Sequence, residues 1–590
     1  MARDGHRLHS RKPSRRPAAT VVEPSPSVGN AVSIFHTHRA CLAACLATLL
    51  LKSLIFAPLG VWPATFVCLV PWLWMVGSAP SASRVYAWSF VLGLVFFLVN
   101  MHWLYFATGW GYVALAVYLA AFFPLMACPL RSVVRRRGWR LAWTFPVVWT
   151  GGELVRAVAL SGFPWFFLSH SFYQVLPLIQ VSDLVGAYGV SFVAAAVNGC
   201  CVDVLASRWR CGRAVLESAK GMRSWPSVAV AAGLLALTLG YGVFQLQRET
   251  TSSGPKVAVL QGDFVSAVYG DDVPEPEKQQ LYLSMLDDAA GQRPDVFLIP
   301  ETPWIMYLNK EARDFFALSR QSFAALQDRA RKYAAHVVAG CASMIPTPHD
   351  LLTRDRRYNS AMVFTPDGAE PQRYDKVHLV YFGEIVPFRF GRFRFLYFWL
   401  NSLMPFSGAD GSFEYSLFPG ERFTRFTLKA SSVPGRNFRF GVPICYEDVM
   451  PYVARRFAAG NGDGQKGVDF LLNISNDGWF GRGVQQPQHL AICVFRAVEN
   501  RVGIARAVNT GISGFVDPDG RLHDLVPGTP EDGWPGAAGY RVGTLRVDSR
   551  WTLYSRFGDW FGWACAIGAL ALFGDYWVAR VRARRVGGVK

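Results

Sequence analysis

The sequence predicts a bundle of membrane helices that carries an α/β domain, and three observations support this fold class. Hydrophobic residues make up 51% of the 590 residues, which is too apolar an average for an ordinary soluble enzyme. The apolar residues concentrate between residues 40 and 246 and again between 557 and 580. The stretch between these regions has a globular composition, in which strand-like and helix-like segments alternate.

About seven apolar segments of membrane-spanning length precede the globular stretch. They are "ACLAACLATLLLKSLIFAPLG", "VWPATFVCLVPWLWMVG", "VYAWSFVLGLVFFLVNMHWLYF", "YVALAVYLAAFFPLMACPL", "LAWTFPVVWTGGELVRAVAL", "VSDLVGAYGVSFVAAAVNGCCVDVLA" and "SVAVAAGLLALTLGYGVFQL". One more segment, "WFGWACAIGALALFGDYWVA", follows it. We therefore predict a polytopic α-helical membrane bundle of about eight transmembrane helices.

The distribution of Lys and Arg predicts how these helices are oriented. Four basic segments fall on one side of the membrane when the helices are threaded in order: "RDGHRLHSRKPSRR", "RSVVRRRGWR", "SRWRCGRAVLESAKGMR" and "RVRARRVGGVK". Short cytoplasmic segments are enriched in positive charge, so this side is assigned to the cytoplasm. An odd number of helices then places the globular stretch outside the cytoplasm. The predicted parts are a basic cytoplasmic tail (1–39), a membrane domain (40–249), an extracytoplasmic globular domain (250–552), a last transmembrane helix (553–580) and a basic cytoplasmic tail (581–590).

The distribution of charge argues against a nucleic-acid-binding protein, and the positions of the cysteines argue against a disulfide-rich domain. The formal net charge of +18 does not indicate nucleic-acid binding, because much of the excess flanks apolar segments, where it sets topology. Of the 11 cysteines, only Cys341, Cys445 and Cys493 lie in the globular stretch, so no disulfide framework is predicted.

Lys52, Glu153 and Arg156 are among the ionisable residues that lie within the predicted membrane helices. Glu153 and Arg156 are one helical turn apart, so they either pair with each other or contact a substrate, and both interpretations stay open. Lys52 is expected to extend its ammonium group to the membrane surface.

The globular stretch alternates strand-like and helix-like segments. The predicted strands are "KVAVLQGD", "DVFLIPET", "HVVAGCAS", "YNSAMVFTPDG", "FRFGVPICYED", "VDFLLNISND" and "VGIARAVNTGISGFVDPDG". The predicted helices include "ARDFFALSRQSFAALQDRARKYAA" and "QPQHLAICVFRAVEN". The continuous apolar character of "VFLI" and "FLLNI" is typical of strands covered on both faces, which indicates an α/β domain. The "TPDG" turn at 365–368 predicts a hairpin.

Three of these segments carry a potentially catalytic side chain. "LIPET" contains Glu301, "RYDKVHL" contains Lys376 and "VPICYED" contains Cys445, and a sheet would bring all three to one edge. A thiol is a good nucleophile only as a thiolate, and a carboxylate base with a lysine ammonium would generate that state and stabilise an oxyanion. Taken singly, each residue also fits a structural role as a solvated carboxylate, a surface charge or an inert buried thiol.

Several separated motifs resemble known families. "PET" at 300–302, "YDKVHLVYFGE" at 374–384, "PICYEDV" at 443–449 and "NISNDGWFG" at 473–481 resemble, in this order, the Glu, Lys, Cys sites of the nitrilase superfamily. The membrane setting narrows the resemblance to the apolipoprotein N-acyltransferase family. Two further segments support it: "GELVRAVALSGFPW" at 152–165 and "QPQHLAICVFRAVENR" at 486–501.

The resemblance implies a fold, a site and a reaction. The fold is an αββα sandwich on eight transmembrane helices. Cys445 is implied as the nucleophile, Glu301 as the general base and Lys376 as the oxyanion-stabilising cation. Supporting roles are implied for Glu384, Tyr446 and Glu447.

The implied reaction moves an acyl chain from a membrane phospholipid, through a thioester on Cys445, to the α-amino group of the diacylglyceryl cysteine of an apolipoprotein. No metal or other cofactor is expected, because His489, His378 and Asp477 do not form a recognisable ligand spacing, and His489 is interpreted as a packing residue. We expect a monomer in the bacterial inner membrane, with the catalytic domain on the periplasmic side.

Several aromatic residues are candidates for substrate contact or for a lid. The family carries a tryptophan shortly after "QGN", whereas this chain has "QGDFVSAVYG", in which Tyr269 is the nearest aromatic residue. The segment 386–406, with Phe388 and Phe390, is interpreted either as a lid at the headgroup level or as an ordinary packed loop. Trp479 and Phe480 either act similarly or fill the core.

Two rival functions differ from an acyltransferase. A membrane-tethered nitrilase-type amidase would share the three catalytic residues but would act on a small amide without phospholipid. A transporter or receptor with an inactive domain would tolerate loss of the Cys445 thiol.

Overall fold

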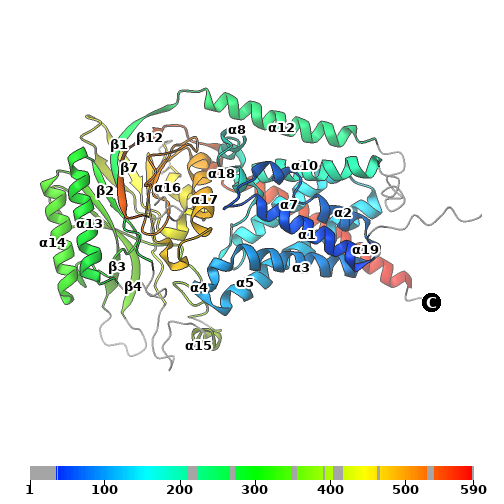
Figure 1. Ribbon diagram of the computed structural model, residues 1–590, viewed down its shortest axis with the longest axis horizontal. Helices are drawn as coiled ribbons and strands as arrows, with labels where there is room; N and C mark the ends of the chain where they lie inside the picture. The colour runs from blue at the N-terminus through cyan, green and yellow to red at the C-terminus, as the bar shows by residue number, and fades with distance from the viewer. Residues whose placement is uncertain are drawn as a thin grey trace, which may run out of the picture.

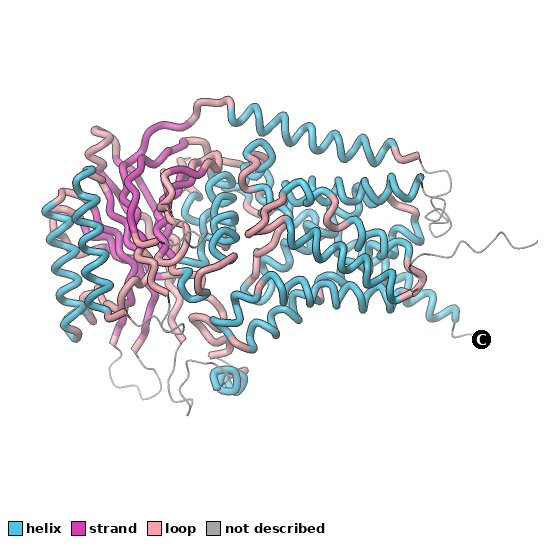
Figure 2. The backbone as a smooth tube through the Cα atoms, viewed as in Figure 1, coloured by secondary structure: helices cyan, strands magenta, loops and turns pink. Residues whose placement is uncertain are grey.

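The computed structural model describes residues 35, 37–208, 223–265, 273–346, 355–389, 392–402, 416–460, 465–527 and 537–587. It contains two parts, a helical bundle and a two-sheet domain (Figure 1). Figure 2 shows that the strands are confined to the two-sheet domain and that the bundle is helical.

Long helices make up the bundle. They are α1 (His38–Leu54), α2 (Val70–Ser78), α3 (Ala82–Asn100), α5 (Trp110–Ala120), α6 (Phe122–Ser132), α7 (Leu141–Val158), α10 (Ala187–Arg208), α12 (Trp225–Leu246) and α19 (Trp560–Gly587). Shorter helices in the loops are α4 (Tyr105–Thr108), α8 (Leu176–Ile179), α9 (Ser182–Val185) and α18 (Leu553–Phe557). The predicted apolar segments therefore all form helices.

Within the described residues, five helical segments are long and apolar enough to cross a membrane: Ala82–Asn100, Trp110–Arg137, Ala187–Arg208, Trp225–Leu246 and Trp560–Arg582. The other three predicted segments form α1, α2 and α7, which run beside them in Figure 1 but are shorter or less apolar. Helix α7 is less apolar because it carries buried Glu153 and Arg156.

Glycines let the bundle helices approach closely. A Cβ atom on Gly151 of α7 would lie 2.8 Å from the Cα atom of Ala566 in α19. A Cβ atom on Gly199 of α10 would lie 2.3 Å from the carbonyl oxygen of Leu141 in α7. Small residues at such crossings allow backbones to pack directly in a membrane bundle.

The other part contains two six-stranded sheets. The first has the order β12-β1-β2-β3-β4-β5 and the second β11-β10-β9-β8-β7-β6. The strands of the first are β1 (Thr251–Gln261), β2 (Val296–Ile299), β3 (His336–Ile345), β4 (Arg356–Phe364), β5 (Gln372–Asp375) and β12 (Gly539–Asp548). Those of the second are β6 (Phe426–Lys429), β7 (Asn437–Gly441), β8 (Phe470–Ser475), β9 (Gly503–Val508), β10 (Gly514–Val516) and β11 (Leu522–His523). Central strands β1, β2 and β3 are parallel, as are β7, β8 and β9.

Helices cover the outer face of each sheet. Helices α13 (Glu275–Ala289) and α14 (Ala317–Lys332) cover the first sheet (Figure 1). Helices α16 (Pro451–Ala458) and α17 (Gln485–Asn500) cover the second, and α17 lies between that sheet and the bundle. Strand β1 shows why the layers form: Val257 and Val259 join the core shared with the second sheet, whereas Ala258 and Leu260 pack with α13 and α14. The predicted αββα sandwich is confirmed.

The predicted strands and hairpin are present, with additions at the edges. The turn at 365–368 joins antiparallel strands β4 and β5, and Gly368 has a φ of +76° that suits glycine. The sequence did not predict α13, α16 or the edge strands β6, β11 and β12.

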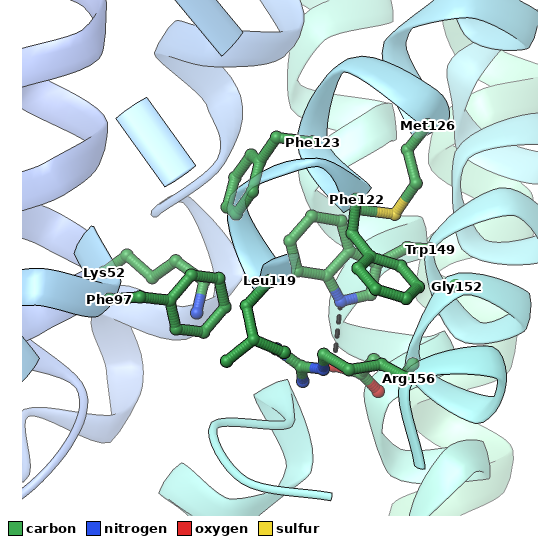
Figure 3. Close-up of a pocket in the computed structure, with 10 residues that line it drawn as sticks. Lys52, Phe97, Leu119, Phe122, Phe123, Met126, Trp149, Gly152 and Arg156 are labelled. Carbon is green, nitrogen blue, oxygen red and sulfur yellow. Dashed lines mark hydrogen bonds between the residues drawn. The ribbon is translucent and has the colours of Figure 1, made fainter. Parts of the chain in front are cut away.

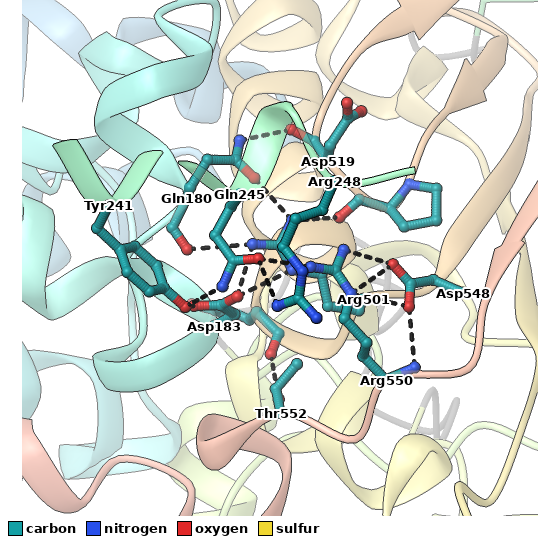
Figure 4. A network of polar contacts seen from close by, with 12 residues as sticks. Gln180, Asp183, Tyr241, Gln245, Arg248, Arg501, Asp519, Asp548, Arg550 and Thr552 are labelled. Atoms are coloured by element: carbon teal, nitrogen blue, oxygen red, sulfur yellow. Dashed lines mark hydrogen bonds and ion pairs between the residues drawn. The ribbon is translucent and has the colours of Figure 1, made fainter. Parts of the chain in front are cut away.

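A buried polar network joins the two parts (Figure 4). The guanidinium of Arg501, at the end of α17, donates to Asp183 of α9 at 2.6 Å and to Gln180 Oε1 at 2.7 Å. Arg550 donates to Asp548, at the end of β12, and reaches Gln245 of α12 at 2.7 Å. The catalytic domain is thereby fixed against the membrane bundle by charges that are removed from water.

Candidate active site

Glu301, Lys376 and Cys445 lie at the ends of strands from both sheets. Glu301 follows β2 and Lys376 follows β5, both in the first sheet, whereas Cys445 follows β7 of the second. The expectation that one sheet edge would hold all three is therefore wrong: the site lies where the carboxyl ends of strands from two facing sheets meet. Glu301 and Lys376 are 5% and 1% exposed, so their charges act with little screening.

A lysine ammonium pairs with two carboxylates at this site. Lys376 Nζ lies 2.9 Å from Glu384 Oε1 and 3.3 Å from Glu301 Oε1. Burial alone would lower the pKa of Lys376, but the two carboxylates outweigh it and hold this pKa well above its ordinary value. Lys376 is therefore a permanent cation beside the nucleophile.

Asn359 of β4 connects the same two carboxylates. Its Nδ2 donates to Glu301 Oε1 at 2.6 Å and to Glu384 Oε1 at 2.8 Å. The other oxygen of Glu301 accepts a hydrogen bond from the backbone N–H of Asn476 at 2.9 Å. Glu301 is thus held in one orientation by three donors. The sequence reasoning missed Asn359, whose only signal was an amide that precedes the apolar end of strand β4 by two positions.

The backbone is strained at the nucleophile. Cys445 has a φ of +52°, in a region that non-glycine residues rarely occupy, and it begins the short turn η11 (Cys445–Asp448). Ile474 N and Asn473 Nδ2 of β8 both donate to Pro443 O at 3.2 Å, which anchors the strand end before the turn. Such an anchored turn presents the side chain of Cys445 to the space between the sheets.

The thiol of Cys445 is not ionised at rest. Burial and then the charge of Glu301 raise the pKa of Cys445 well above its ordinary value, although Lys376 acts in the opposite direction. Attack by this thiol therefore requires a base that removes its proton. Glu301 is the carboxylate with the strongest electrostatic effect on it.

Glu447 ties the turn of the nucleophile to the loop of Lys376. Its carboxylate accepts hydrogen bonds from Val377 N (2.7 Å), His378 N (3.0 Å), Ile444 N (2.9 Å) and the hydroxyl of Tyr374 (2.9 Å). Burial raises the pKa of Glu447 to about 7, against the lowering effect of these donors. With its lone pairs occupied, Glu447 positions the site rather than transferring protons.

Tyr446 faces the membrane bundle. Its hydroxyl donates to the carbonyl of Gly162, in the loop after α7, at 3.2 Å. Its ring lies over His378, with centroids 5.9 Å apart and planes at 27°. The residue after the nucleophile therefore contacts both parts of the protein.

A second buried charge cluster lies behind the nucleophile, and the sequence reasoning missed it. His489 of α17 places Nε2 2.6 Å from Asp448 Oδ1 and Nδ1 3.0 Å from Asp477 Oδ1. Arg506 of β9 lies 3.4 Å from Asp448 and 3.7 Å from Asp477. Burial alone would lower the pKa of His489, but the two aspartates raise it to about 9, so the imidazole is charged at neutral pH.

This cluster connects the nucleophile with the base. Asp448 ends the turn that Cys445 begins, and Asp477 follows Asn476, whose N–H holds Glu301. The interpretation of His489 as a plain packing residue is corrected, because it forms charged contacts to both turns. The signal was present in the sequence as two acidic residues, Asp448 and Asp477, that each lie inside one of the quoted motifs.

Segments that connect the bundle helices contact the catalytic domain beside this charge cluster. Trp165, in the loop after α7, donates from Nε1 to Gln488 Oε1 at 3.0 Å, and its ring lies 5.7 Å from that of His489. Phe480 meets Trp103 of the bundle edge-on, with centroids 4.9 Å apart. Phe480 therefore packs at the interface, one of the two roles predicted for it.

The remaining candidates differ in what the structure describes. Tyr269 and Phe390 lie outside the described residues. Trp479 is 40% exposed, and Phe388 is 47% exposed and packs edge-on against Phe393. Helix α15 (Arg394–Ser402), within the candidate lid, exposes Phe395, Phe398 and Trp399 by 58% or more. These rings are not packed on the domain, which favours the lid over an ordinary packed loop.

Comparisons with known proteins match both parts of the chain. Residues 49–200 match the apolipoprotein N-acyltransferase N-terminal domain, and residues 256–532 match the carbon-nitrogen hydrolase domain. An apolipoprotein N-acyltransferase of Geobacter metallireducens is 30% identical over 547 residues, which cover 90% of this chain and 94% of the relative. One from Nitrosomonas europaea is 26% identical over 486 residues, covering 79% and 85%.

Among solved structures, a CN-hydrolase superfamily protein of Xanthomonas campestris covers 50% of this chain and 91% of its own, with 18% identity and a TM-score of 0.33. An amidase of Nesterenkonia sp. AN1 covers 52% of this chain and 96% of its own, with 18% identity and a TM-score of 0.32.

Proposed function

Because this chain belongs to the apolipoprotein N-acyltransferase family, we propose that Cys445, Glu301 and Lys376 carry out the acyl transfer. The protein is a membrane enzyme that N-acylates apolipoproteins with acyl chains from phospholipid. The observation that carries the assignment of residues is the buried Lys376, paired with Glu301 and Glu384 beside the strained turn of Cys445.

In the first step, Glu301 takes the proton of the Cys445 thiol as sulfur attacks an ester carbonyl of the phospholipid. Lys376 stabilises the oxyanion that develops on the carbonyl oxygen. When the C–O bond breaks, Glu301 returns the proton to the leaving alcohol, which departs as a lysophospholipid. The acyl chain then remains on Cys445 as a thioester.

In the second step, the α-amino group of the diacylglyceryl cysteine attacks the thioester. Glu301 accepts a proton from the amine and the Cys445 sulfur leaves, which gives an amide and restores the thiol. Because the first product leaves before the acceptor reacts, the kinetics are expected to be ping-pong. The exposed aromatic rings of α15 suit contact with lipid at the headgroup level.

Orientation and oligomeric state belong to the same proposal. The Lys and Arg distribution supports a catalytic domain on the periplasmic side of the bacterial inner membrane, and we infer a monomer with the five-part division given above. A cysteine-accessibility assay on intact cells, with a single reporter cysteine in the catalytic domain, tests the orientation.

The acyl transfer is tested on purified full-length protein with an acyl-labelled phospholipid and no acceptor. Mass spectrometry is expected to find the label on the peptide that contains Cys445, sensitive to hydroxylamine and transferable to the amino group of a diacylglyceryl peptide. No label on Cys445, together with cleavage of small amides in the absence of phospholipid, would instead establish the tethered amidase.

A further inference from the structure

The membrane bundle contains three buried ionisable side chains close to the catalytic domain. Lys52 of α1 and Glu153 and Arg156 of α7 line one cavity, with apolar side chains of α3, α5 and α6 around them (Figure 3). They are only 2%, 3% and 7% exposed. In Figure 3, the side chains of Lys52 and Arg156 extend toward the same space from opposite sides. The expectation that Lys52 reaches the membrane surface is therefore wrong.

The two cations have no acceptor in the part of the chain that the structure describes. Lys52 Nζ and Arg156 Nε are buried without a hydrogen-bond partner there. Lys52 Nζ instead lies 3.8 Å from the ring centroid of Phe96, and Arg156 Cζ lies 5.4 Å from that of Phe167. Aromatic faces attract cations but supply no lone pairs.

Glu153 does not neutralise them by direct pairing. Its Oε1 accepts hydrogen bonds from Trp149 Nε1 and Leu168 N, both at 2.9 Å, and its Oε2 has no partner among the described residues. The open question of whether Glu153 and Arg156 form an ion pair is thereby answered, since no such pair is present. The cavity therefore brings two basic side chains together with one carboxylate whose hydrogen bonds are made to other groups.

An unpaired charge at this depth is costly unless a ligand satisfies it. A ligand that suits the cavity is an anion with several oxygen acceptors. A phosphodiester has both properties, and the acyl chains on its glycerol suit the Phe and Leu side chains of the lining.

The two basic side chains of the cavity lie near the ends of their helices. Lys52 and Arg156 each precede the last residue of their helix by two positions, which is about 3 Å along the helix axis. The chain after α7 turns back, with Phe163 N donating to Arg156 O at 2.9 Å. In that loop Gly162 accepts the hydrogen bond of Tyr446, the neighbour of Cys445.

We propose that Lys52 and Arg156 bind the phosphodiester of the acyl-donor phospholipid, and so present its ester carbonyl to Cys445. This assignment rests on the proposed function. The donor carries its phosphodiester and its acyl esters on one glycerol, whereas the diacylglyceryl acceptor carries no phosphate. The site therefore acts in the first half-reaction only. Glu153 forms part of the cavity wall, where Trp149 Nε1 and Leu168 N hold its carboxylate.

The test measures the rate of Cys445 acylation in the full-length protein with two donors. One donor is phosphatidylglycerol, and the other is a p-nitrophenyl ester of the same fatty acid, which has no phosphate. The variants are Lys52→Met and Arg156→Met, which remove charge but keep length. Arg131→Met is the matched control, because Arg131 is also buried in the bundle but donates to Val76 O and Pro80 O at 3.0 and 2.9 Å.

We expect both variants to slow acylation by phosphatidylglycerol by about tenfold or more and to keep the p-nitrophenyl ester rate within about twofold of the parent. The control is expected to keep the parent's ratio of the two rates. Excess inorganic phosphate is expected to leave the phosphatidylglycerol rate unchanged.

Three results would overturn the inference. Equal slowing with both donors would indicate a structural role, and unchanged rates with both would show that the cations do not bind the donor. Inhibition by inorganic phosphate in the parent but not in Arg156→Met would assign the site to free phosphate. If the parent acquires no acyl group from either donor, the proposed function itself fails, which is a separate outcome.

Discussion

The imidazole of His489 lies 2.6 Å from the carboxylate of Asp448, the last residue of the turn that Cys445 begins. The other ring nitrogen faces Asp477, so one charged side chain holds two turns of the active site together. His489 touches no reacting group and is therefore a positioning residue.

Replacing His489 with Gln is expected to lower both kcat and the melting temperature. The variant leaves Asp448 and Asp477 buried against the single charge of Arg506, and breaking such a cluster costs about 3 kcal/mol or more. The acylation rate is expected to fall at least about tenfold with little change in KM for phospholipid. His336→Gln, a buried histidine at the start of β3, is the control. A wild-type rate in His489→Gln would refute the positioning role.

The same histidine predicts a dependence of stability on pH. Its pKa is about 9 in the folded protein and 6.5 in its ordinary state, so its contribution is complete below pH 6.5 and is lost as the pH rises through 9. The free energy of unfolding is expected to fall by about 3 kcal/mol between pH 6 and pH 10, and the melting temperature is expected to fall with it. The drop should be smaller in His489→Gln, and an identical drop in both proteins would contradict this assignment.

Changing Asn359 to Asp is expected to impair the enzyme more than changing it to Ala. Asn359→Ala removes two hydrogen bonds to the carboxylates, at a cost of about 1–3 kcal/mol each. Asn359→Asp loses the same hydrogen bonds and also adds a third carboxylate beside the two that Lys376 already pairs with, so repulsion between like charges is added. The acylation rate of Cys445 is expected to fall at least about tenfold further in Asn359→Asp than in Asn359→Ala. Equal acylation rates in the two variants would argue against it.

Glu301→Gln is expected to abolish accumulation of the acyl-enzyme. The amide cannot take the proton of Cys445, whose pKa is raised, so the acylation rate is expected to fall by about 10²–10⁴. Rapid-quench mass spectrometry of the Cys445 peptide measures this rate. Glu370→Gln, at an ion pair whose Glu side chain is 49% exposed, is the control and should behave as the parent. Normal acylation in Glu301→Gln would assign the base elsewhere.

Arg501→Met is expected to destabilise the contact between the bundle and the catalytic domain. The variant leaves Asp183 buried and short of its charged partner, and loss of one member of a buried pair costs about 3–5 kcal/mol. In detergent, the variant is expected to begin thermal unfolding at a lower temperature than the parent. The bundle and the catalytic domain are expected to unfold in two transitions, where the parent is expected to show one. Arg521→Met serves for comparison, since that ion pair is exposed. Equal melting curves for the two variants would disprove the role of Arg501.

The sequence predicts the layers of the fold because burial leaves a periodic pattern. Strands β2 and β8 are covered on both faces and therefore read as apolar runs. Helix α13 was missed because its mean character is polar and only one face is buried, at Tyr282, Met285 and Leu286. The edge strand β11 was missed because it has only two residues and both are half-buried.

Glu301, Lys376 and Cys445 were predicted as candidate catalytic residues because each stands at a strand end with a reactive side chain. Asn359 and His489 were not, since an amide in a strand and a histidine in a helix gain their roles only from partners far away in the sequence. Asn359 meets Glu301 across 58 positions, and His489 meets Asp448 across 41. Contacts of this kind depend on how the two sheets face each other, which local sequence patterns do not encode.

The pairing of β1 with β12 sets Thr251 opposite Asp548, so the chain enters and leaves the catalytic domain at one place. Helix α12 leads into β1, and β12 leads through α18 into α19. The catalytic domain is thus inserted between α12 and α18, and its first and last strands lie side by side. A segment with adjacent ends can be gained or lost by a helical bundle without separating its helices, and the excised segment can be closed by a short linker.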